Sequence, residues 1–153
     1  MNSKANRHAS RGFSPMSIPF NDPINAMTWI SRHQFKPVVP AKISPTADGI
    51  EFEFGQEGAH EQVFWSGITA VLFEKVDLYT VDSIVCFLIF QEESKLKAII
   101  FDEEDDGFYD ATSAFEENLP AFDRRWWSKV AFPPFELCRH QAFPYSESGE
   151  FGA

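Results

Sequence analysis

The hydrophobic pattern of the chain is organised around the stretch from Trp65 to Phe101. Three consecutive strands are predicted there, Ile68–Glu74, Asp82–Gln91 and Lys95–Phe101. The middle strand is apolar on both alternating sets of positions, with Ile84, Cys86, Leu88 and Phe90 on one face and Val85, Phe87 and Ile89 on the other. Because a strand that is apolar on both faces must be covered on both sides, we place it at the centre of a sheet or barrel.

A hairpin is predicted before these strands. In Ile50–Phe54 the apolar residues alternate with two glutamates, which is typical of a half-exposed antiparallel strand. The preceding Thr46–Gly49 ends in an Asp-Gly pair, which favours a tight reversal after a strand at Ala41–Pro45. His60–Trp65 is expected to return along the sheet, and Lys75–Val81 to form an exposed loop.

A helix is predicted after the sheet, in Gly107–Leu119. Apolar residues recur there at helical spacing, at Phe108, Ala111, Phe115 and Leu119. The acidic run Asp102–Asp106 lies at or before the start of this helix, where the unpaired amides favour negative charge.

A second, shorter helix is predicted at Arg124–Ala131. Asp123 precedes it as a candidate cap, and Phe122 and Trp127 occupy the positions of a hydrophobic staple. The two adjacent tryptophans of this helix are expected to divide into one core residue and one partly exposed residue. A final edge strand is expected at Phe135–Phe143.

The chain is predicted to comprise a mobile basic arm at 1–20, a single α+β domain at 21–145 and a flexible tail at 146–153. The domain is expected to begin with a short helix at Asp22–Ile30. Strands followed by helices indicate an α+β fold: an antiparallel sheet or a half-open barrel, followed by two short C-terminal helices. The order of elements is similar to that of pleckstrin-homology-like domains, with two short helices in place of a single long one.

Charge is distributed unevenly along the 153 residues. The net charge is −10, and residues 43–153 hold 22 of the 23 acidic side chains. An acidic body repels nucleic acid and anionic membranes and attracts basic partners. Two cysteines are too few for a disulfide framework, and Cys86 is expected to be a buried free thiol. With no apolar run of signal-peptide or membrane-spanning length, the chain is predicted to be cytoplasmic.

The acidic run Asp102–Asp106 is the most conspicuous candidate site. It could be a solvated helix-cap face, a docking patch for a basic partner or a calcium site, although it lacks the spacing of an EF-hand loop. The loop Glu74–Asp82, between the first two of these three strands, could also bind Arg or Lys side chains of a partner. Its aromatic residue, Tyr79, lies among the carboxylates. The predicted partner-binding residues are Glu74, Asp77, Tyr79, Asp82, Asp102, Glu103, Glu104, Asp105 and Asp106.

Catalytic residues, metal ligands and cofactor motifs are not predicted. The four histidines are scattered, and there is no glycine-rich phosphate loop. Cys138 is followed by Arg139 and His140, which is a weak signal for an activated thiol. An enzyme is therefore the least favoured class.

Residues 65–135 are similar to a bacterial family of small uncharacterised proteins. The family pattern combines a Trp-x-x-Ile strand, a Lys-x-Asp-Leu loop ending in Thr-x-Asp-x-Ile, a Glu-Glu-x-x-Gly-Phe helix start and a Val-Ala-x-Pro-x-Phe close. Pro134 departs from it where the family has a small residue. The matching positions are Trp65, Ile68, Lys75, Asp77, Leu78, Thr80, Asp82, Ile84, Glu103, Glu104, Gly107, Phe108, Val130, Ala131, Pro133 and Phe135. The resemblance implies a fold and no activity.

Two functions follow from these observations. The first is a small acidic protein-binding module, in its most specific form an immunity protein that neutralises a basic bacterial toxin. The second is a pleckstrin-homology-like structural domain that docks a peptide, or copies of itself, through a sheet edge. Co-purification of the product of a neighbouring gene would separate the two.

Overall fold

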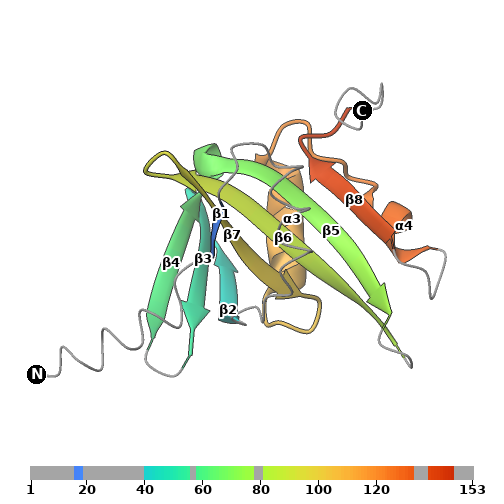
Figure 1. The fold of residues 1–153 in the computed structure, drawn as a ribbon, viewed down its shortest axis with the longest axis horizontal. Coiled ribbons are helices and arrows are strands. Elements are labelled where there is room, and N and C mark those ends of the chain that lie inside the picture. Colours follow the sequence, from blue (N-terminus) through green and yellow to red (C-terminus); the bar gives the residue numbers. More distant parts are fainter. Residues whose placement is uncertain (1–15, 19–39, 56–57, 78–80, 133–137, 147–153) are drawn as a thin grey trace, which may run out of the picture.

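The computed structural model describes residues 16–18, 40–55, 58–77, 81–132 and 138–146 of the chain (Figure 1). Their strands form a five-stranded antiparallel sheet in the order β1-β7-β6-β5-β8 and a three-stranded antiparallel sheet in the order β2-β3-β4. The elements are β1 Met16–Ile18, β2 Pro40–Pro45, β3 Gly49–Phe54, β4 Ala59–Phe64, η1 Trp65–Gly67, β5 Ile68–Asp77, β6 Asp82–Glu92, β7 Lys95–Asp102, α3 Phe108–Asn118, α4 Trp126–Ala131 and β8 Cys138–Phe143.

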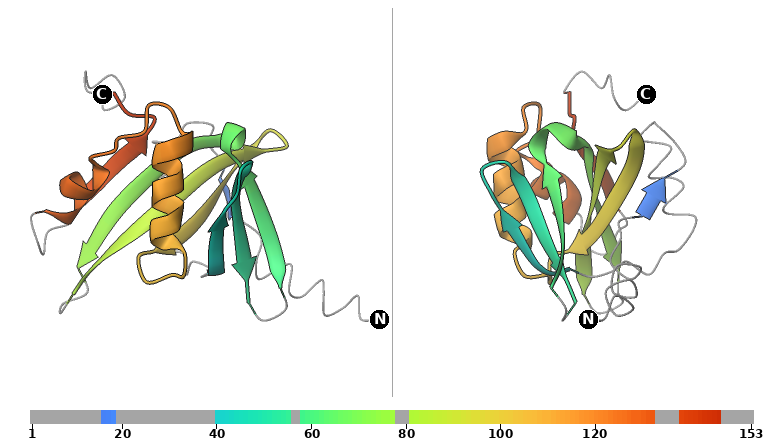
Figure 2. Two further views of the ribbon diagram at one scale, coloured as in Figure 1. Left: turned by 180° about the vertical axis from the view of Figure 1, so that it is seen from behind. Right: turned by 90° about the vertical axis from the view of Figure 1, so that its left-hand side faces the viewer.

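The predicted α+β class is confirmed, with antiparallel pairing and two short helices after the central strands. The strands divide into two sheets that do not close into a barrel. Figure 2 shows α3 crossing one face of the larger sheet, with the smaller sheet on one side of it and α4 and β8 on the other. No helix in the part of the chain that the structure describes is long and apolar enough to cross a membrane.

Several predictions fall wholly or partly outside the described residues. The helix at Asp22–Ile30 is one of them, as are most of the predicted arm and tail. Within the predicted arm, Met16–Ile18 pairs with Leu96–Ala98 of β7. The domain boundaries therefore stay predictions.

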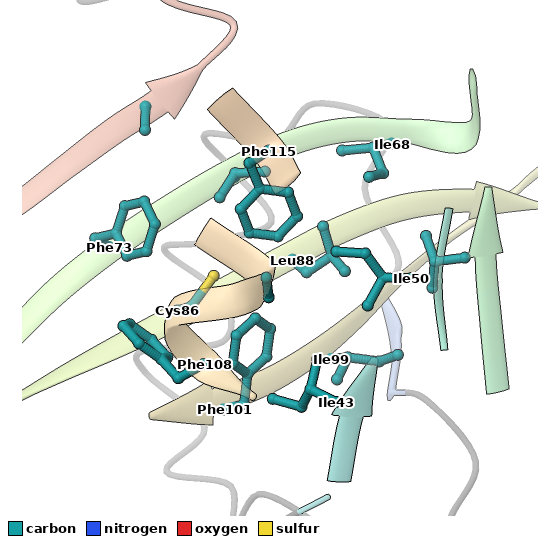
Figure 3. Close-up of a cluster of buried hydrophobic side chains, with 14 of the residues drawn as sticks. Ile43, Ile50, Ile68, Phe73, Cys86, Leu88, Ile99, Phe101, Phe108 and Phe115 are labelled. Carbon is teal, nitrogen blue, oxygen red and sulfur yellow. The ribbon is translucent and has the colours of Figure 1, made fainter. Parts of the chain in front are cut away.

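The central strand β6 lies between β5 and β7, as its pattern predicts. Its two faces enter two separate hydrophobic clusters, and both Cys86 and Phe87 are buried. The larger cluster receives side chains from β2, β3, β5, β6, β7 and α3 (Figure 3). The smaller cluster lies on the opposite face and consists of Ala70, Leu72, Phe87, Ile89, Leu96 and Ala98.

Helix α4 packs through Trp126, whose ring stacks on that of Phe73 at 3.8 Å between centroids. Trp126 and Val130 are both buried, because residues four apart share one face of a helix. The predicted staple between Phe122 and Trp127 is wrong: α4 begins at Trp126, and Trp127 is 40% exposed. The predicted division of the two tryptophans into a core and an exposed residue is confirmed.

Strand β5 continues to Asp77, so Lys75 is not in an exposed loop as predicted. Lys75 is 1% exposed, and its Nζ donates to the carbonyl oxygen of Ala131 at 3.3 Å. The physical reason is that Ala131 ends α4, where helix carbonyls lack intrahelical partners and attract a cation. A buried lysine thus ties the end of α4 to the large sheet.

The segment before α4 also joins the end of β8, the last strand of the large sheet. The amide of Asp123 donates to the carbonyl oxygen of Ala142 at 2.8 Å, and the amide of Tyr145 donates to that of Ala121 at 2.8 Å. β8 is therefore bonded to β5 and, at its end, to this segment. The predicted final edge strand is confirmed for Cys138–Phe143.

Candidate functional site

The acidic run Asp102–Asp106 lies in the turn between β7 and α3, and it is bonded to both sheets. The amide of Glu103 donates to the carbonyl oxygen of Ile84 at 3.0 Å, and the amide of Ile84 donates to Glu103 Oε1 at 3.2 Å. On the other side, the amide of Ile43 in β2 donates to the carbonyl oxygen of Asp106 at 2.9 Å. The turn is consequently a fixed connection between the two sheets.

Carboxylates of the turn also bond its own backbone. Asp105 Oδ2 accepts the amide of Asp102 at 2.8 Å, and Asp102 Oδ1 accepts the amide of Glu104 at 2.9 Å. Gly107 completes the turn at φ 94°, and a Cβ there would lie 2.0 Å from the carbonyl oxygen of Ile43. Only glycine fits this backbone conformation and this close approach.

The run lies directly before α3, as predicted, but its side chains do not cap the helix. The capping position of α3 is Gly107, and no side chain caps the helix. The carboxylates of Asp102, Glu103 and Asp105 instead accept backbone amides in the turn and from β6. Glu104 and Asp106 have exposed side chains, so these two can meet a partner.

Asp105 has an unfavourable electrostatic environment for a carboxylate. Burial is the main reason that its pKa is raised above the ordinary value, and the negative charges of Asp102 and Glu104 add to the effect. The hydrogen bond from the backbone of Asp102 opposes the rise in pKa only in part. Burial of this carboxylate, with like charges beside it, is thus a cost that the turn carries.

The other predicted site residues lie on the hairpin of β5 and β6. Glu74 Oε2 is 3.2 Å from Arg139 Nη2 on β8, so this carboxylate is already in an ion pair. Asp77 is opposite Asp82 at the end of the hairpin, and Val85 is opposite Asp102. Asp82 and the acidic turn therefore share one end of the sheet. Tyr79 lies outside the described residues.

Two exposed aromatic rings beside the turn were not predicted as site residues. Tyr109, the second residue of α3, is 52% exposed, and Trp127, the second residue of α4, is 40% exposed. Their ring centroids are 6.0 Å apart. Tyr109 Oη donates to Glu103 Oε2 at 3.0 Å, which attaches the aromatic pair to the acidic turn.

We call the exposed carboxylates of the turn and of the start of α3, together with Glu103 and the two aromatic rings, the acidic–aromatic surface. Burial raises the pKa of Tyr109, and its hydrogen bond to Glu103 and the charge of Glu103 raise it further, so the phenol stays a neutral donor. Asp110 follows Tyr109 on α3 and is exposed. The surface comprises Glu103, Glu104, Asp106, Tyr109, Asp110 and Trp127.

A second polar constellation surrounds the carboxylate of Asp123, which is 4% exposed. Its Oδ2 accepts Lys129 Nζ at 2.6 Å and lies 2.8 Å from His140 Nε2, and its Oδ1 accepts the amide of Arg125 at 3.0 Å. Lys129 Nζ also donates to Tyr145 Oη at 2.6 Å. We call Asp123, Lys129, His140 and Tyr145 the Asp123 cluster.

The pKa values of the Asp123 cluster reflect this bonding. Burial alone would raise the pKa of Asp123, but the hydrogen bonds from Lys129, Arg125 and His140 lower it below the ordinary value. Burial also acts to lower the pKa of Lys129, yet its bonds to Asp123 and Tyr145 raise it. Burial is the main reason that the pKa of His140 is lowered, and the charge of Lys129 acts in the same direction.

The Asp123 cluster joins the segment before α4 to β8, and Cys138 Sγ completes the contact by donating to the carbonyl oxygen of Lys129 at 3.0 Å. Each of the two carboxylate oxygens of Asp123 has at least one donor. Such a saturated arrangement holds elements together, whereas a general base needs an oxygen that can reach a substrate proton.

Across the described ranges, no group of three or more His, Cys, Asp and Glu side chains is arranged to hold a metal ion. Comparisons with protein families, with curated proteins and with solved structures find no match to this chain. The resemblance to a bacterial family therefore stays a prediction.

Proposed function

We propose that the chain is a protein-binding module that binds a basic protein through its acidic–aromatic surface. The observation that carries the proposal is a pair of exposed aromatic rings, Tyr109 and Trp127, of which Tyr109 donates its hydroxyl to Glu103 in the carboxylate turn. Aromatic residues with polar tips are enriched at protein interfaces, because they supply a large contact area and lose little conformational freedom on binding.

The bonding of the turn supports this proposal. Because both sheets fix the backbone at Glu103 and Asp106, a partner would not have to order the turn on binding. The exposed carboxylates of Glu104, Asp106 and Asp110 would attract a basic partner from a distance. The acidic residues of 43–153 would add to the same long-range attraction.

In its most specific form, the proposal is an immunity protein that neutralises a basic bacterial toxin in the cytoplasm. An inhibitor of this kind needs fast association with its target, and opposite charge supplies it. The saturated bonding of the Asp123 cluster favours a binding module over an enzyme, since the most conspicuous buried polar group has a structural partner at each oxygen.

The test is to co-purify the full chain with the product of a neighbouring gene and to measure the association rate by stopped-flow fluorescence at several salt concentrations. We expect the double variant Asp106→Asn/Asp110→Asn to associate about three- to tenfold more slowly at low salt and to show a flatter salt dependence. Glu51→Gln on β3 is the matched control, because it removes an exposed carboxylate from the other sheet.

The control variant should show only the small general effect of one lost charge. A salt-independent association rate, equal in the wild type and in the double variant, would contradict the proposal. The acidic residues would then serve solubility alone.

A further inference from the structure

We infer that the acidic–aromatic surface recognises an arginine side chain of its partner in preference to a lysine. This inference rests on the proposed function and names the chemistry of the contact. The reason is that Tyr109 links an exposed aromatic ring to a carboxylate: its ring lies 6.0 Å from that of Trp127 between centroids, and its hydroxyl donates to Glu103.

A guanidinium matches this combination of groups. It is planar and weakly hydrated, so it can stack on the exposed aromatic pair of Tyr109 and Trp127 while its N–H groups donate to the carboxylate of Glu103. A lysine ammonium is compact and strongly hydrated, and it gains less from an aromatic face at an exposed site. The geometry therefore favours arginine even where the total charge of two partners is equal.

The recognition groups are held in place before any partner binds. Glu103 accepts the amide of Ile84 with Oε1 and the hydroxyl of Tyr109 with Oε2. The ring of Trp127 meets the buried ring of Trp126 edge to face at 5.4 Å between centroids. Because the supporting residues belong to the core and to β6, little conformational entropy would be lost in ordering this surface on binding.

Two basic side chains near α4 are already bonded elsewhere. Lys129 donates to Asp123 and Tyr145, and Arg124 donates to the carbonyl oxygen of Glu116. The carboxylate of Glu103, by contrast, is bonded to a neutral amide and a neutral hydroxyl. Each oxygen of Glu103 has a donor, as in Asp123, but Lys129 balances the charge of Asp123 while both donors to Glu103 are neutral, so a cation from outside can still bind its remaining lone pairs.

The experiment compares two capped peptides of equal length and charge, one with arginine and one with lysine at every basic position. Binding to the full chain is followed by NMR titration of the tryptophan indole N–H signals at about 0.15 M salt, where charges are screened over about 8 Å. We expect the arginine peptide to bind about fivefold more tightly, which corresponds to one cation–π contact. The signal of Trp127, assigned by its loss in Trp127→Leu, should shift most.

The variant Trp127→Leu should abolish the preference for arginine and leave the affinity for the lysine peptide within about twofold. Phe64→Leu is the matched control, because Phe64 is an aromatic residue that is 54% exposed on β4, in the other sheet. This control should keep the preference.

The two kinds of failure are distinguishable. Equal, salt-sensitive binding of both peptides with no response of Trp127 would overturn the arginine inference and leave the proposed function standing. Absence of binding by either peptide would overturn the proposed function, and this inference with it.

Discussion

The acidic turn and the Asp123 cluster use carboxylates in opposite ways. The turn has five carboxylates in succession at Asp102–Asp106, and two of them are exposed. The cluster has a single carboxylate, which is buried and bonded to an ammonium, an imidazole and an amide. The density of acidic residues in a sequence therefore does not indicate where a carboxylate contributes most to stability.

The directions of the pKa shifts express the same difference. Burial and neighbouring negative charges raise the pKa of Asp105, so the turn opposes the ionised form of this residue. Around Asp123, donors and a cation outweigh burial and lower the pKa. A half-buried carboxylate with too few donors is a cost to folding, and a buried carboxylate with several donors is a source of stability.

The largest effect is expected when Asp123 is removed. Asp123→Ala would leave Lys129 and His140 without their carboxylate; because the Lys129 side chain is 31% exposed, we expect a loss of about 2–3 kcal/mol, below the cost of breaking a fully buried ion pair. The free energy of unfolding, measured by urea denaturation at pH 7, should fall by about that amount. If Asp123→Ala cost no more than Asp106→Asn in the exposed part of the turn, the contrast between the two regions would be wrong.

An intermediate effect is expected from pH. The pKa of His140 is lowered in the folded state, so its neutral form contributes stability above about pH 6.5, the ordinary value. This contribution is lost as the pH falls through 6.5 toward the folded pKa. The lowered pKa of Asp123 adds a further loss at lower pH, below the ordinary carboxyl range. The urea midpoint should therefore decline on acidification from pH 7.

The variant His140→Gln isolates the histidine from the other groups. Its amide can still donate to Asp123, but it does not titrate, so the decline between pH 7 and 5.5 should flatten while the stability at pH 7 changes little. An unchanged pH profile in this variant would show that other groups cause the decline.

The smallest effect is expected in the exposed part of the turn. Glu104→Gln/Asp106→Asn removes two charges and keeps the size of both side chains, and Asp106 bonds β2 through its backbone, not its side chain. The free energy of unfolding should stay within about 0.5 kcal/mol of wild type in thermal or urea denaturation. A loss comparable to that of Asp123→Ala would mean that these two carboxylates are structural after all.

Much of the fold could be predicted because the necessary signals are local. The two faces of β6 follow from a period of two, and the buried side of α3 follows from a spacing of three and four residues. The end of β5 could not be predicted in this way. A charged residue at Lys75 resembles a loop unless the end of α4 is known to lie against it.

Less of the candidate site could be predicted, because its residues are distant in the sequence and close only in the folded structure. Tyr109 and Trp127 lie on different helices, and nothing in either local pattern indicates that their rings are neighbours. Asp123 could be recognised only as a residue before a helix, since its partner His140 is on a strand that follows later in the chain. The acidic run was conspicuous, but sequence alone could not separate its structural carboxylates from its exposed ones.

The hydrogen bonds between the segment before α4 and the end of β8 also bear on how the protein behaves at high concentration. A strand at the end of a sheet offers free backbone groups to any other strand, which is a common start for aggregation and for the exchange of strands between molecules. Here the carbonyl of Ala142 is already occupied by the amide of Asp123. Loosening the Asp123 cluster would therefore do more than weaken the fold: it would free backbone groups at the end of β8 for pairing with a strand of another molecule.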